Sequence, residues 1–99
     1  MRPAPFRPSS AHLFVCTNAR AATDPLGAGC GARGASVVEA MKRAVAQGGL
    51  ASRVWVSRTH CLGVCPTEGA AVAVSPTGAL FTEVTAADAA GLVAAARGA

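Results

Sequence analysis

The sequence has few aromatic residues, a single lysine and no long hydrophobic run. Aromatic side chains make up 4% of the 99 residues, and tyrosine is absent. The net charge is +4, but the basic residues are scattered, and they stand side by side at Lys42-Arg43 alone. Nucleic-acid-binding proteins concentrate basic residues and use aromatic ones for stacking. We therefore predict no nucleic-acid partner.

No apolar run approaches the ~20 residues that cross a bilayer, so no membrane span is expected. Residues 1–9 contain Arg2, Arg7 and three prolines, and no hydrophobic segment follows them, so they resemble neither a signal peptide nor a transit peptide. We expect a cytoplasmic protein with a flexible tail over residues 1–9. Residues 10–99 form a single domain, because the chain is too short for two cores.

The hydrophobic patterns predict four strands and two helices. Residues 11–16 are an apolar strand that ends at Cys16, and residues 17–29 are a loop. Val38, Met41 and Val45 repeat with helical spacing, and Gly48-Gly49 ends that helix. Strands follow at 52–59, 70–75 and 79–84. A capping box at Thr85–Asp88 begins a last helix that buries Leu92, Val93 and Ala96.

This β-α-β-β-β-α order is the minimal thioredoxin-like arrangement, an α/β fold with a four-stranded mixed sheet and two helices. The first strand–helix–strand unit implies that its two strands are parallel. If both helices cover one face of the sheet, the other face is left bare. Trp55 then lies either on that bare face, where a partner would cover it, or buried within the monomer.

Four cysteines, Cys16, Cys30, Cys61 and Cys65, stand out in the spacing C-x13-C followed by C-x3-C. In a cytosolic protein such thiols favour metal binding or redox chemistry over disulfides. A thioredoxin-type dithiol prefers C-x2-C at a helix start, and zinc ribbons prefer two tight pairs. An iron–sulfur cluster takes four thiolates and accepts wider spacing. A thiol-based redox enzyme and a zinc-stabilised binding module remain the alternatives.

The chain resembles the thioredoxin-like [2Fe–2S] ferredoxins, also called Shethna-type. The resemblance covers roughly residues 11–96 and rests on three motifs: Leu13-Phe14-Val15-Cys16-Thr17-Asn18, Cys30-Gly31-Ala32-Arg33-Gly34-Ala35, and Cys61-Leu62-Gly63-Val64-Cys65 with the later Gly69. It implies that Cys16, Cys30, Cys61 and Cys65 ligate a [2Fe–2S] cluster and that the protein is a homodimer. The chain departs from the family at Gly69-Ala70 and Leu80-Phe81, where Gly-Pro and an aromatic pair ending in Tyr are usual.

Four cysteine ligands leave no open coordination position for a substrate. We therefore predict a low-potential one-electron carrier that exchanges electrons with redox partner proteins, rather than an enzyme. Gly31 and Gly63 should let backbone amides approach the sulfur atoms. His60 is most simply a loop residue and His12 a structural one. Arg20, Arg33 and Arg58 are interpreted as a solvated rim, with docking of an acidic partner as the alternative.

Overall fold

Four strands and two α-helices follow one another in the order that the sequence predicts. The computed structural model describes residues 1–3, 11–20, 23–25, 29–64, 66 and 68–97. Most of the predicted tail therefore lies outside the described residues, as does Cys65. The elements are β1 (Ala11–Cys16), α1 (Gly31–Gln47), β2 (Val54–Thr59), β3 (Ala70–Ser75), β4 (Ala79–Val84) and α2 (Ala89–Arg97), with a 3₁₀ turn, η1 (Ala86–Asp88), before α2.

The strands form one mixed sheet in the order β2-β1-β3-β4. Strand β1 pairs in parallel with β2 and antiparallel with β3, and β3 pairs antiparallel with β4. The central place of β1 explains its composition, because Leu13 and Val15 are fully buried there. Since β1 and β2 are parallel, their carboxyl ends lie at the same end of the sheet, which is where the site is built.

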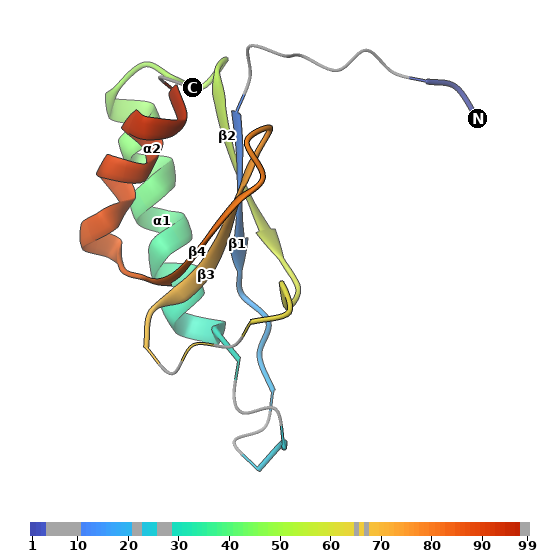
Figure 1. Ribbon diagram of the computed structural model, residues 1–99. Helices are drawn as coiled ribbons and strands as arrows, with labels where there is room; N and C mark the ends of the chain where they lie inside the picture. The colour runs from blue at the N-terminus through green and yellow to red at the C-terminus, as the bar shows by residue number, and fades with distance from the viewer. Residues whose placement is uncertain (4–10, 21–22, 26–28, 65, 67, 98–99) are drawn as a thin grey trace.

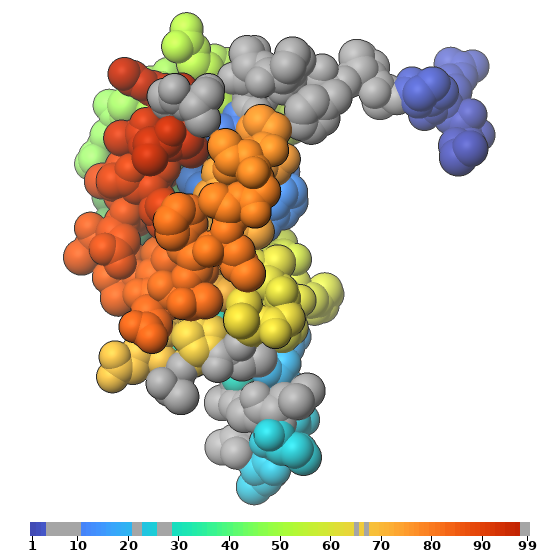
Figure 2. Space-filling view, viewed as in Figure 1, coloured from blue at the N-terminus to red at the C-terminus, as the bar shows by residue number. Residues whose placement is uncertain are grey.

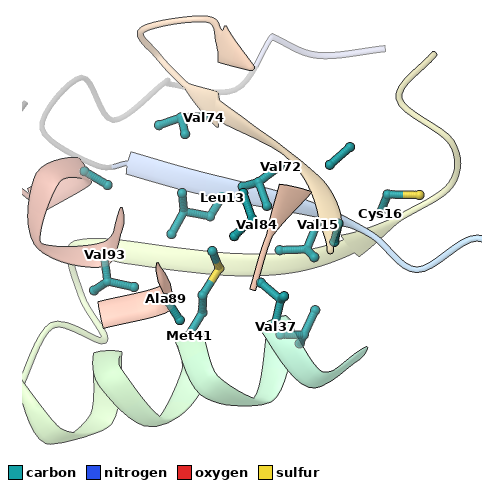
Figure 3. Packing of buried hydrophobic residues seen from close by; sticks show 14 of the residues in the cluster. Leu13, Val15, Cys16, Val37, Met41, Val72, Val74, Val84, Ala89 and Val93 are labelled. Atoms are coloured by element: carbon teal, nitrogen blue, oxygen red, sulfur yellow. The ribbon is translucent and has the colours of Figure 1, made fainter. Parts of the chain in front are cut away.

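Both helices lie on one face of the sheet (Figure 1). In α1 the buried side chains recur every three or four residues, as Val38, Met41 and Val45 do. Met41 and Val37 point toward the sheet, and Leu13 and Val15 of β1 lie across from them (Figure 3). Val93 and Ala96 of α2 are buried as predicted, and Leu92 packs against the core. Met41 is thus a core residue and takes no part in the site.

Two local signals in the sequence are confirmed. Thr85 and Asp88 form the predicted capping box, in which the Thr85 backbone N–H donates to the Asp88 carboxylate at 3.0 Å. Strand β2 begins at Val54, two residues later than the alternation predicts. The reason is a turn: the backbone N–H groups of Arg53 and Val54 both donate to the Leu50 carbonyl, at 2.8 and 2.9 Å.

The sheet face opposite the helices, here called the open face, carries an aromatic and apolar group of side chains. It comprises His12, Phe14, Trp55, Ala73 and Leu80, which share the face through strand alternation and register. The His12 and Phe14 rings stack at 4.1 Å, and Trp55 meets His12 edge-on at 6.0 Å. Trp55 is 47% exposed, so burial of Trp55 within the monomer is wrong.

Candidate metal centre

Cys16 and Cys30 lie together beneath the surface at the end of β1. Each thiol is 1% exposed, and their side chains are hydrogen-bonded to each other. Neither is joined in a disulfide. Cys16 closes the central strand, and the following Thr17 N–H donates to the Thr59 carbonyl at 3.0 Å, which ties the chain after Cys16 to β2. The structure therefore brings two of the four predicted ligands together.

The loop between these two cysteines is closed at its base. Ala19 and Gly29 form an antiparallel bridge, and the Gly31 N–H donates to the Asn18 carbonyl at 3.1 Å. Gly29 has φ +76°, and a Cβ at this position would collide with the Asn18 carbonyl oxygen. Residues 23–25 lie at the far end of the loop, away from the sheet (Figures 1 and 2).

Helix α1 begins directly at the second cysteine. Cys30 is its N-cap, and the Gly34 N–H donates to the Cys30 carbonyl at 3.0 Å. The first turn contains no acidic residue, so the partial positive charge of the helix N-terminus is available to an anionic group at Cys30. Gly34 is buried against the main chain of Cys16, which brings the helix close to the strand.

The electrostatics of Cys30 follow from this packing. Burial raises the pKa of the Cys30 thiol, and a hydrogen bond from the Ala71 backbone acts against that increase. The neighbouring Cys16 raises the Cys30 pKa further, while the positive charge of Arg33 lowers it. A pair of buried thiols of this kind binds a soft metal ion by releasing protons, because the thiolate is the ligand.

Cys61 follows β2 and is exposed, unlike the first two cysteines. Cys16 pairs with Thr59 across the parallel strands, so Cys61 comes two residues after the strand end that adjoins Cys16. Its sulfur accepts a hydrogen bond from the Gly63 N–H at 3.3 Å, and Gly63 has φ +89°. The predicted approach of the Gly63 backbone to a sulfur is therefore confirmed.

The three cysteines that the structure describes, Cys16, Cys30 and Cys61, are not grouped as one set. Cys65 lies outside the described residues. Within them, no three His, Cys, Asp or Glu side chains are grouped closely enough to hold a metal ion. The structure thus places Cys16 and Cys30 together and Cys61 at the same end of the sheet, apart from that pair. Two adjacent buried cysteines beside a helix N-terminus nonetheless supply two of the four soft sulfur donors that a [2Fe–2S] cluster requires.

Arg33 has a contact that the sequence did not indicate. Its guanidinium donates to the Gly29 carbonyl at 2.7 Å and to the Pro66 carbonyl at 3.2 Å. Gly29 precedes Cys30, and Pro66 follows Cys65. An arginine beside a cysteine carries no signal that it will reach a backbone carbonyl 33 residues away, so sequence analysis could only assign it to the rim.

The other candidate residues lie at the surface. Arg58 pairs with Glu39 at 3.3 Å, and both side chains are exposed. His60 is exposed and lines a shallow hollow of about 320 Å³ together with residues 17–19, Arg58 and Thr59. His12 lies elsewhere, on the open face, where its Nε2 is 2.6 Å from the Ser57 hydroxyl.

Among the described helices, none is long and apolar enough to cross a membrane.

The comparisons with known proteins agree with this arrangement. No protein-family model matches the chain. A "Ferredoxin, 2Fe-2S" from Clostridium pasteurianum is 34% identical over 77 residues, which are 78% of this chain and 74% of that protein. The wild-type thioredoxin-like [2Fe-2S] ferredoxin from Aquifex aeolicus superposes with a TM-score of 0.76 at 26% identity, over 87% of this chain and 84% of that chain. A cysteine-to-serine variant of the same ferredoxin gives a TM-score of 0.73 at 27% identity, over 85% of this chain and 83% of that chain.

The fold, the paired thiols and these relatives together identify an electron carrier of the ferredoxin class. The chain belongs to the thioredoxin-like [2Fe–2S] ferredoxins.

Proposed function

We propose that the chain is a low-potential one-electron carrier in which Cys16, Cys30, Cys61 and Cys65 ligate a single [2Fe–2S] cluster. The observation that carries the proposal is the buried pair Cys16 and Cys30 at the N-terminus of α1, at the sheet end where Cys61 follows β2. The clostridial relative is named a 2Fe-2S ferredoxin, which supports the same cofactor for this chain.

When bound, the cluster supplies one-electron redox chemistry in the potential range of all-cysteine centres, below that of His-ligated ones. The chain's own residues prepare the site for it. Cys16 and Cys30 offer buried sulfurs, and the N–H groups of Ala71 and Gly63 donate to the sulfurs of Cys30 and Cys61. Hydrogen bonds to sulfur stabilise its negative charge, so they would favour the thiolate form of the ligands with the cluster bound.

The test is the metal content and spectroscopy of the chain purified without oxygen. We expect iron and acid-labile sulfide in equal amounts and a spin-half EPR signal on one-electron reduction. Cys30→Ser and Cys61→Ser should lose or distort the cluster spectrum, while His60→Ser, which removes a neighbour of Cys61, should keep it. A colourless, zinc-loaded protein would overturn the proposal in favour of a binding module.

We also propose that the chain acts as a carrier and not as an enzyme. Four protein ligands leave no coordination position for a substrate. The partners are then a reductase and an acceptor protein that dock where the cysteine loops reach the surface. A thiol-based enzyme using Cys61 and Cys65 is the alternative. It would turn over disulfide substrates with the cluster removed, whereas the carrier would not.

A second copy of the chain is proposed to cover the open face. This support comes from the exposed side chains there: Trp55 is 47% and Leu80 49% exposed on a face with no covering element among the described residues. Sedimentation velocity should show a dimer that Trp55→Ala weakens. Phe81→Ala is the matched control, because Phe81 pairs with Val72 and lines a hollow with Leu92 on the helix side of the sheet. A monomer at all concentrations would refute the dimer.

The proposed location is the cytoplasm. Cys16 and Cys30 are buried as thiols, although they touch each other, and thiols persist in reducing compartments. Cell fractionation followed by immunoblotting tests this location directly, with recovery in the periplasmic or membrane fraction as the contrary result.

A further inference from the structure

Arg33 lies between the two segments that carry the cysteines. It stands in the first turn of α1, three residues after Cys30, and its side chain is partly buried. One guanidinium nitrogen, Nη2, is 2.7 Å from the Gly29 carbonyl oxygen and 3.2 Å from the Pro66 carbonyl oxygen. The first acceptor directly precedes Cys30 and the second directly follows Cys65. The Arg33 guanidinium therefore links the main chain next to Cys30 with the main chain next to Cys65.

We propose that Arg33 is a positioning residue that fastens the loop of Cys61 and Cys65 to the Cys30 end of α1, and that its charge favours electron uptake at the site. The inference rests on the proposed ligation by the four cysteines and assigns a role that ligation alone does not require. Two hydrogen bonds of Arg33 go to backbone oxygens, those of Gly29 and Pro66.

A positively charged donor suits this position. Hydrogen bonds from a charged donor are about twice as strong as neutral ones, and the two N–H groups of Nη2 lie in the guanidinium plane, which fixes their directions. The loop packs on the core through Leu62 and Val64, while Cys61 and Gly63 are exposed. Within the loop, the Gly63 N–H donates to the Cys61 sulfur. The Arg33 bond to Pro66 adds a hydrogen-bonded link between this loop and the first turn of α1.

The positive charge of Arg33 acts on the same site. Arg33 stands in the first turn of α1, and its guanidinium is 2.7 Å from the carbonyl oxygen of Gly29, the residue next to Cys30. Adding an electron to a cluster makes it more negative, and a nearby positive charge stabilises that reduced state. Removing the charge should therefore shift the midpoint potential to a more negative value.

The experiment compares four cluster-loaded proteins: wild type, Arg33→Gln, Arg33→Lys and Arg43→Gln. Arg43 lies on the same helix, exposed and near its other end, so Arg43→Gln removes an equal charge away from the site. The measurements are the rate of cluster bleaching in excess chelator and the midpoint potential by voltammetry. Loss of a partner beyond the ligands costs roughly 10- to 100-fold in metal affinity, so we expect bleaching of Arg33→Gln to be faster by that order.

Arg33→Gln should also show the more negative potential. Arg33→Lys keeps the charge but loses the planar guanidinium with its fixed donor directions, so it should bleach faster than wild type at a nearly unchanged potential. Arg43→Gln should match wild type in both measurements. An Arg33→Gln protein with wild-type bleaching and potential would overturn the inference, as would an equal effect of Arg43→Gln.

If Arg33→Gln cannot be isolated with a cluster, circular dichroism of the metal-free chains decides. If metal-free Arg33→Gln unfolds at the same temperature as the metal-free wild type, the result supports a positioning role for Arg33. If metal-free Arg33→Gln is already unfolded, Arg33 is needed for the fold and the proposal is overturned. The Cys30→Ser and Cys61→Ser variants separate the two proposals. If both keep the wild-type spectrum, the ligand assignment fails; if they lose it while Arg33→Gln is unaffected, the role of Arg33 alone fails.

Discussion

Gly34 provides the sharpest test of how closely α1 must approach the central strand. A Cβ at this position would lie 2.9 Å from the carbonyl carbon of Cys16, 3.3 Å from the Cα of Thr17, and closest of all to the Cys16 carbonyl oxygen. All three are main-chain atoms, so no side chain can turn aside. Gly34→Ala must therefore push the N-terminus of α1 away from Cys16 by roughly an ångström or more.

The size of the effect follows from two opposed contributions. Replacing glycine by alanine inside a helix normally stabilises it by about 0.5–1 kcal/mol. Overpacking a closely packed interior costs about 1–3 kcal/mol. Since the colliding atoms belong to the backbone, the cost should exceed the gain, and we expect a net loss of about 1–2 kcal/mol. For a domain of this size that loss corresponds to a midpoint temperature lower by about 5–15 °C.

The assay is thermal unfolding followed by far-ultraviolet circular dichroism, together with chelator-induced cluster loss. Gly91→Ala is the matched control: Gly91 is exposed in α2, and a Cβ there meets no atom within 4 Å. Gly91→Ala should raise the midpoint slightly and leave cluster loss unchanged. Gly34→Ala should lower the midpoint and speed cluster loss, because the shift separates Cys30 from Cys16.

A Gly34→Ala protein as stable as Gly91→Ala would refute this reasoning. It would mean that the helix N-terminus is not pressed against Cys16 in solution. A lower midpoint with unchanged cluster loss would show that the contact serves the fold and does not govern the spacing of the thiols.

Two further predictions concern single side chains. Burial lowers the pKa of His12 below its ordinary 6.5, so the unfolded chain takes up the proton first. The contribution of His12 to the free energy of unfolding should be complete above pH 6.5 and decrease as the pH drops toward the lowered pKa. His12→Gln should flatten this pH dependence, measured by urea unfolding. An unchanged slope of the unfolding free energy against pH would contradict the prediction. Gly63 and Gly78 have φ +89° and +77° with open space around them, so alanine costs each about 1–2 kcal/mol of backbone strain. Of the two variants, Gly63→Ala alone should speed cluster bleaching, because the Gly63 N–H donates to the Cys61 sulfur whereas the Gly78 N–H donates to the Val74 carbonyl. Equal bleaching of the two variants would refute that role.

Much of the fold could be predicted because local signals agreed with the topology. Burial alternates along Ala11–Cys16, and Val38, Met41 and Val45 mark one helical face. Two strands joined by that helix should be parallel, and this alone placed Cys16 and Cys61 at one end of the sheet. The bare face followed from having both helices on the other side, although the position of Trp55 on it could not be decided from alternation.

The site was less accessible to prediction, because its contacts join distant segments. The bond from Arg33 to the Pro66 carbonyl depends on the path of a loop that sequence patterns do not describe. The need for glycine at Gly34 depends on the Cys16 carbonyl, which lies across the packing of α1 on β1. Cys61 stands apart from the buried pair, so the expectation that it joins them stays a prediction for the loaded protein.

The bridge between Ala19 and Gly29 has a consequence for how this site can vary. The bridge, with the Gly31 bond to Asn18, fixes the span from Cys16 to Cys30 at the root of the loop. We therefore expect residues added beyond the bridge to leave the two thiols in place. Doubling such a loop costs only about 0.6 kcal/mol in closure entropy. The length of the interval between the first two cysteines can then change at little cost, provided that the bridge is kept.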